Sequence, residues 1–125
     1  MATRGVILLA HGARDPSWAE PFEAIRRRLE ALAPGTPVSL AFLELMTPDV
    51  DGAARALVAR GCRAITVVPA FLGVGGHVRR DVPSLVDALR RAHPDLDVSL
   101  AGALGEDAGV QDAMAKAALA AVLKG

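Results

Sequence analysis

The chain has 125 residues, of which 52% are hydrophobic, so we expect a single folded domain, residues 1–125, and not a disordered segment. Basic and acidic residues number 14 each, and a net charge of zero gives no general attraction toward nucleic acid or an anionic membrane. Aromatic residues make up only 3%, with no tyrosine, which argues against platforms for stacking single-stranded bases.

Cys62 is the only cysteine, which excludes an internal disulfide and a thiolate metal cluster and fits a reducing cytoplasm. No apolar run approaches the ~20 residues that a membrane span requires. The opening MATRGVILLAHG lacks a small-residue cleavage signal, so we interpret it as a strand and not as a secretion signal.

The first half of the chain begins with GVILLA (5–10), a near-continuous apolar run that is typical of a strand covered on both faces. Ser17 and Glu20 then predict a capping box for a first helix. Its apolar stripe consists of Ile25, Leu29 and Leu32. PVSLAFL (37–43) is the second predicted strand.

Thr47 and Pro48 have the residue types expected at the N-cap and first position of a second helix. The apolar residues of this helix recur at the spacing of one buried face. They are Val50, Ala53, Ala54, Leu57 and Val58. Gly61 stands where the glycine that ends a helix belongs, and RAITVVPA (63–70), rich in β-branched residues, predicts the third strand.

The second half continues the same alternation. A third helix carries Val82, Leu85, Val86 and Leu89. LDVSLAG (96–102) is the fourth predicted strand, and a fourth helix carries Val110, Ala113, Met114, Ala117, Ala118, Ala121 and Val122. The order β-α-β-α-β-α-β-α predicts an α/β fold with a parallel sheet and helices on both faces. We expect the flavodoxin-like strand order 2-1-3-4.

Three chemically active residues follow successive predicted strands. His11 follows the first, Glu44 follows the second, and His77 lies in the glycine-rich loop FLGVGGHVRRD after the third. The carboxyl ends of parallel strands meet at one edge of the sheet, where ligands bind near the reversal of strand order. Two imidazoles and a carboxylate there could bind a divalent metal such as Co²⁺, Ni²⁺, Fe²⁺ or Zn²⁺, or act as bases.

The glycine-rich loop also raises the alternative of a phosphate-binding loop. It lacks the Gly-Lys-Ser/Thr ending of a P-loop and the full G-x-G-x-x-G spacing, and it follows the third strand instead of the first. The histidine interpretation therefore remains. By contrast, His93 is interpreted as a residue at a helix C-terminus, and Cys62 as a small buried side chain.

Three stretches of the sequence resemble the class II tetrapyrrole chelatases, most closely the short-form sirohydrochlorin chelatases. They are LLAHGARDP, AFLELMTPDV and VVPAFLGVGGHVRRDVP, and the resemblance spans essentially the whole chain. It implies an ATP-independent lyase that inserts cobalt, iron or nickel into sirohydrochlorin, a carboxylate-rich tetrapyrrole of cobalamin or siroheme biosynthesis. The metal ion is then a substrate, and no tightly bound cofactor is expected.

The resemblance also implies roles for individual residues. His11, Glu44 and His77 match the residues that bind the metal and help to deprotonate the macrocycle. Ala13 departs from the pattern, because many relatives have serine there, but no metal ligand is lost.

Carboxylates on the substrate make arginines at this edge candidate clamps, namely Arg14, Arg79 and Arg80. Gly75 and Gly76 would let the loop approach the ring. Long family members hold two such halves, so the resemblance implies that this half-domain forms a homodimer. The alternative is a non-catalytic carrier of metal or tetrapyrrole, which would bind stoichiometrically and stop.

Overall fold

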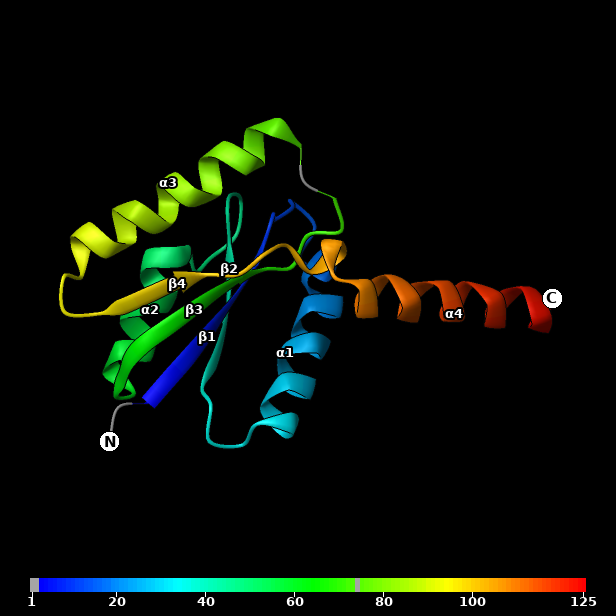
Figure 1. Ribbon diagram of the computed structural model, residues 1–125, viewed down its shortest axis with the longest axis horizontal. Helices are drawn as coiled ribbons and strands as arrows, with labels where there is room; N and C mark the ends of the chain where they lie inside the picture. The colour runs from blue at the N-terminus through cyan, green and yellow to red at the C-terminus, as the bar shows by residue number, and fades with distance from the viewer. Residues whose placement is uncertain (1–2, 74) are drawn as a thin grey trace.

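The computed structural model describes residues 3–73 and 75–125, apart from the side chain of His77. Its strands form a parallel sheet in the order β2-β1-β3-β4, as predicted (Figure 1). The strands are β1 (Thr3–Ala10), β2 (Val38–Phe42), β3 (Cys62–Pro69) and β4 (Asp97–Leu100). The α-helices are α1 (Glu20–Leu32), α2 (Val50–Ala59), α3 (Gly76–Ala92) and α4 (Ala108–Lys124). Two short 3-10 helices, η1 (Pro16–Ala19) and η2 (Leu104–Glu106), lie in the connections.

The continuous apolar run of β1 is explained by burial on both faces of the sheet. Ile7 and Leu9 point toward α2 and α3, in a core that also contains Ile65 and Val67 of β3. Leu8 faces the opposite side, where it clusters with residues of the neighbouring strand β2 and side chains of α1 pack against the cluster. Successive side chains of a strand alternate between faces, so a strand with a helix layer on either side is apolar at every position.

The structure corrects both predicted N-caps. Asp15 caps η1, because its Oδ1 accepts hydrogen bonds from the Ser17 amide at 3.0 Å and the Ser17 hydroxyl at 2.8 Å. The Ser17 hydroxyl is therefore occupied by Asp15, and α1 begins only at Glu20. Similarly, α2 is capped by Asp49, whose Oδ1 accepts a hydrogen bond from the Gly52 amide at 2.8 Å.

Helix α2 otherwise follows the sequence pattern closely. Its apolar stripe packs against the sheet, except that Val58 is 43% exposed. Thr47 and Pro48, joined by a cis peptide bond, precede the helix instead of starting it. Gly61 follows the helix with a φ of 95°, as a C-terminal glycine should.

Helix α4 does not cover the sheet, in contrast to the other helices. It extends away from the sheet to the right of Figure 1, and residues 111–125 are all exposed. The sheet surface that a fourth helix would cover carries hydrogen-bonded polar side chains. There Arg4 Nη1 donates to Thr66 Oγ1 at 3.2 Å, and Thr66 Oγ1 lies 3.2 Å from Ser99 Oγ. These polar side chains lie on the same face of the sheet as the partly buried Val6 and Val68, and α4 does not cover this face.

Cys62 begins β3 as a buried side chain, as predicted, and burial raises the pKa of its thiol. A raised pKa means that less thiolate is present at pH 8 than in the unfolded chain, where cysteine titrates near ~8.5. We expect a thiol reagent such as DTNB to label the native protein at least about tenfold more slowly than the protein unfolded in guanidinium, because the thiolate is the nucleophile. Equal labelling rates at pH 8 would contradict this burial.

Within the described residues, no helix is long and apolar enough to cross a membrane.

Candidate active site

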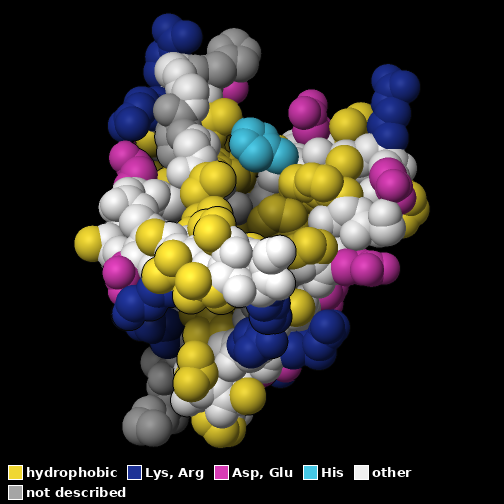
Figure 2. All heavy atoms as spheres, turned by 90° about the vertical axis from the view of Figure 1, so that its right-hand side faces the viewer, with side chains coloured by type: hydrophobic (Ala, Val, Ile, Leu, Met, Phe, Trp, Pro, Cys, Tyr) yellow, Lys and Arg dark blue, Asp and Glu magenta, His cyan; other side chains and the backbone are white. Residues whose placement is uncertain are grey.

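The loops after β1, β2 and β3 meet at the carboxyl edge of the sheet, as the strand order requires. His11 is the first residue after β1, and Glu44 is the second residue after β2. His77 is the second residue of α3, which follows β3. Viewed from the right-hand side of Figure 1, the surface is hollowed, and a histidine stands beside the hollow among hydrophobic side chains (Figure 2).

His11 and Glu44 are joined through their backbones. The pairing of β1 with β2 continues beyond the strands, because the Leu43 amide donates to the Ala10 carbonyl at 3.0 Å and the Glu44 amide donates to the His11 carbonyl at 3.1 Å. Both side chains are exposed at this edge. The predicted proximity of these two residues is therefore confirmed at the level of the backbone.

Gly12 makes this close approach sterically feasible. Its φ is 101°, a conformation that residues with a side chain rarely adopt, and a Cβ at this position would overlap the carbonyl oxygen of Glu44. The backbone of the β1 loop can therefore lie against the β2 loop only because residue 12 has no side chain.

The His11 ring rests on the buried ring of Phe71. The two ring centroids are 4.4 Å apart with an interplanar angle of 32°, and Phe71 is 3% exposed. The Ala70 amide donates to the Leu9 carbonyl at 2.7 Å, which ties the loop after β3 to β1. One face of the imidazole is thus packed against the core while the side chain remains accessible, so its orientation is restricted before any ligand arrives.

His77 is only partly described. Its backbone lies in the first turn of α3, just after the N-cap residue Gly75, but its side chain lies outside the described residues. Among the described side chains, no group of three His, Cys, Asp or Glu residues gathers in a way that could hold a metal ion. The three-residue metal site of His11, Glu44 and His77 therefore stays a prediction.

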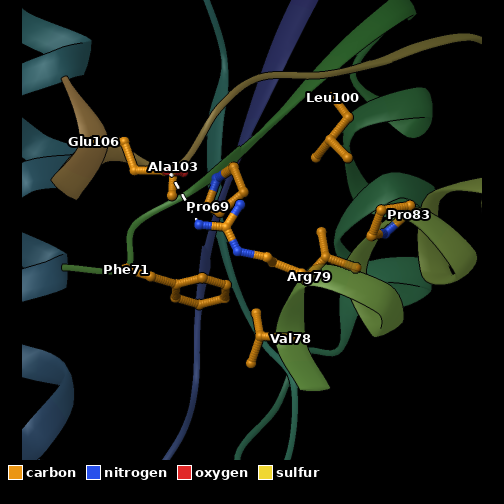
Figure 3. A pocket seen from close by; sticks show the side chains of 9 residues that line it. Pro69, Phe71, Val78, Arg79, Pro83, Leu100, Ala103 and Glu106 are labelled. Atoms are coloured by element: carbon orange, nitrogen blue, oxygen red, sulfur yellow. Dashed lines mark hydrogen bonds and ion pairs between the residues drawn. The ribbon is translucent and has the colours of Figure 1, made fainter. Parts of the chain in front are cut away.

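The candidate arginine clamps have different surroundings. Arg79 reaches across a small pocket of about 120 Å³ between α3 and η2, where its Nη2 lies 3.5 Å from Glu106 Oε2 (Figure 3). Arg14 and Arg80 are exposed. Arg79 therefore already has a carboxylate partner within the chain.

Sequence reasoning missed several residues of this site. The sequence places Phe71 in the loop after the third strand, and nothing in the pattern predicts that its ring packs against His11. Glu106 gave no signal, because it is 27 residues from Arg79 and lies in a short turn. Gly12 could have been noticed, since a glycine directly after a strand-end histidine favours a close backbone approach.

A second, larger groove lies beside the His11–Phe71 pair. It has a volume of about 420 Å³ and is lined by apolar side chains of α1, the loop after β3 and the start of α4. The main lining residues are Phe22, Ile25, Phe71, Leu72, Val110 and Met114.

The fold and the edge residues define an α/β protein in which His11 and Glu44 are joined through their backbones at the carboxyl edge of a parallel sheet. The chain belongs to the CbiX family, whose family model matches residues 5–121.

Curated relatives carry the name sirohydrochlorin cobaltochelatase. The protein of Methanopyrus kandleri is 35% identical over 81 residues, which are 65% of this chain and 57% of that protein. The protein of Sulfolobus acidocaldarius is 31% identical over 108 residues, which are 86% of this chain and 84% of that protein. The match thus extends over little more than half of the first relative but over most of the second.

Solved structures share the fold. A CbiX protein from Marinobacter aquaeolei VT8 has a TM-score of 0.87 at 29% identity, covering 98% of this chain and 99% of that chain. The sirohydrochlorin chelatase SirB from Bacillus subtilis, in complex with cobalt, has a TM-score of 0.74 at 24% identity. The match covers 84% of this chain but only 45% of SirB, so this chain corresponds to about half of the longer protein.

Proposed function

We propose that the protein is an ATP-independent sirohydrochlorin chelatase that inserts a divalent metal, cobalt first and iron or nickel as alternatives. The names of the relatives that match over most of their length support this assignment. The observation that carries it is the backbone pairing of His11 with Glu44 beside the buried ring of Phe71. We also propose that it acts in the reducing cytoplasm, where its single thiol stays reduced.

Metal insertion requires two changes that this edge can promote. The macrocycle must release two pyrrole N–H protons, and the metal ion must exchange its waters for ring nitrogens. His11, as a neutral imidazole, would bind the arriving metal or accept a pyrrole proton, and Glu44 would balance the ion's charge or pass protons on to solvent. His77 would supply the second imidazole from the first turn of α3.

The substrate's shape favours two copies of the chain. A tetrapyrrole is a flat ring with two faces, and the carboxyl edge of one sheet can cover only one of them. We therefore propose that residues 1–125 act as a half-domain and that two copies close on the ring from opposite sides.

The substrate's carboxylates would be held by arginines at the same edge. Arg14 and Arg80 are exposed and can reach outward, whereas Arg79 would first exchange Glu106 for a substrate carboxylate. An exposed ion pair is weak, so this exchange costs little. Gly75 and Gly76 carry no side chains that would keep the loop backbone from the ring.

Turnover under anaerobic conditions tests the proposed function. The protein is incubated with excess sirohydrochlorin and Co²⁺, Fe²⁺ or Ni²⁺ in separate reactions, and the absorption spectrum reports the metallated ring. We expect many product molecules per chain with at least one metal, above the rate without protein. A change that stops at one equivalent per chain would instead establish a carrier.

A further inference from the structure

Leu45, the residue directly after Glu44, combines two unfavourable features. Its φ is 66°, and among the described residues other than glycine it alone has a positive φ. Its side chain is also 62% exposed, so the free protein leaves most of this apolar surface in water. A bulky apolar residue is rarely found in the left-handed conformation. Because residues held in such conformations cluster at functional sites, this outlier calls for a functional explanation.

The path of the backbone explains the conformation of Leu45 but not the choice of its side chain. The Glu44 amide donates to the His11 carbonyl at 3.1 Å, which fixes the start of the turn. Farther along, the Pro48 carbonyl accepts a hydrogen bond from the Phe42 amide at 3.0 Å, which brings the loop back to the end of β2. A left-handed residue between these two bonds reverses the chain. Glycine or asparagine would make the same turn at lower cost, so the leucine side chain needs another reason.

The place of Leu45 beside the metal-handling residues indicates what its side chain contacts. In the proposed function, His11 and Glu44 deliver the metal to the centre of a flat macrocycle, and the ring extends outward from that centre. An exposed side chain directly next to Glu44 would therefore lie against the face of the ring. The face of a tetrapyrrole is apolar, whereas its carboxylates lie at the rim. An exposed leucine thus complements the face, as exposed arginines complement the rim.

We propose that Leu45 is a substrate-contacting residue, whose side chain packs against the face of the tetrapyrrole and holds the ring over His11 and Glu44. This inference rests on the proposed function and adds a residue that selects for a flat apolar ring. The two hydrogen bonds of the loop hold Leu45 in place before the substrate arrives, so little freedom is lost on binding. Contact with the ring then removes from water the apolar surface that the free protein leaves exposed.

Three variants separate contact with the ring from the turn. Leu45→Asn keeps the turn but removes the apolar contact, since asparagine tolerates a positive φ. Leu45→Met keeps an apolar side chain of similar volume and is the conservative variant. Leu32→Asn is the control, because it makes the same chemical change at a leucine that is 83% exposed and ends α1, before the chain enters β2 at the opposite edge of the sheet.

Binding of sirohydrochlorin without added metal, followed by the absorption spectrum of the ring, measures the contact without turnover. We expect Leu45→Asn to raise the Kd about 3- to 10-fold, the effect of losing part of the burial of one leucine side chain. Leu45→Met and Leu32→Asn should bind as the wild type does. In the insertion assay, KM should rise with the Kd while kcat stays near the wild-type value, because the contact is present in both the ground state and the transition state.

Urea denaturation excludes a merely structural role. Leu45→Asn should be at least as stable as the wild type, because asparagine relieves the strain of the positive φ. Weaker binding of the ring by a protein of undiminished stability is a combination that the loss of a packing residue does not give.

A Leu45→Asn protein that binds the ring as tightly as the wild type would overturn the contact while leaving the chelatase activity intact. If Leu45→Asn instead halves the mass of a dimeric wild type in sedimentation, Leu45 lies between two copies of the chain, which also overturns the contact. If the wild type binds sirohydrochlorin but inserts no metal, the chelatase proposal fails, and weaker binding by Leu45→Asn still establishes the contact with the ring.

Discussion

Replacing His11 with alanine is expected to lower the rate of metal insertion by about 100-fold or more, the usual contribution of a positioned base. The substitution removes the only imidazole described at the carboxyl edge and leaves the buried ring of Phe71 uncovered. Because His11 itself is exposed, the fold should remain intact. The measurement is the initial rate of sirohydrochlorin metallation with cobalt, corrected for insertion without protein.

His93→Ala is the control for removing an imidazole elsewhere. His93 ends α3, as expected, and its Nε2 lies 2.9 Å from Asp51 Oδ1 of α2. Losing this link between two helices should lower the free energy of unfolding by about 1 kcal/mol. The insertion rate should stay at the wild-type value. A His11→Ala protein that inserts metal as fast as His93→Ala would refute the assignment of the site.

Glu44→Gln tests whether the negative charge of Glu44, and not only the shape of its side chain, contributes to metal insertion. Glutamine keeps an oxygen that can bind the metal but cannot carry negative charge or accept a proton at neutral pH. We therefore expect a smaller loss of rate than for His11→Ala.

The strand order of the sheet could be predicted because it follows from local sequence patterns and from the connections between successive elements. Alternating strand and helix patterns require parallel strands, and residues directly after neighbouring strands then meet at one edge. That argument correctly places the backbone of His11 next to that of Glu44. The side-chain contacts at the edge were not predictable in this way, because the packing of His11 on Phe71 depends on the path of the loop after β3.

The position of α4 escaped prediction for a different reason. An apolar helical pattern shows that a surface will be covered, but it does not identify what covers it. In this structure α4 leaves uncovered the sheet face on which Thr66 and Ser99 place their hydroxyl groups. The predicted N-caps were wrong for a local reason. Asp15 and Asp49 stand within two residues of the predicted caps Ser17 and Thr47, and all four residues are of types suited to an N-cap position.

Gly12→Ala is expected to lower the free energy of unfolding by more than about 2 kcal/mol. The positive φ of 101° alone costs a residue with a side chain about 1–3 kcal/mol. In addition, the new methyl group would overlap the Glu44 carbonyl oxygen, so the β1 and β2 loops must separate. Urea denaturation followed by circular dichroism measures the loss.

Alanine substitutions at three other glycines separate the cost of a positive φ from the cost of steric overlap. Gly35→Ala meets neither obstacle, since no atom lies within 4 Å of the added Cβ and its φ is ordinary, so stability should change little. Gly61→Ala has only the conformational cost, because its φ is 95° but its surroundings are open. Gly105→Ala has only the steric cost, because its Cβ would overlap the Leu72 carbonyl.

The four alanine variants thus separate strain from overlap and connect them to function. If overlap drives the β1 and β2 loops apart, Gly12→Ala moves Glu44 away from His11, whereas Gly61→Ala leaves that pair untouched. The insertion rate of folded Gly12→Ala should then fall well below that of Gly61→Ala, even at temperatures where both are fully native. Equal rates in the two variants would mean that metal insertion does not depend on the backbone pairing of His11 with Glu44.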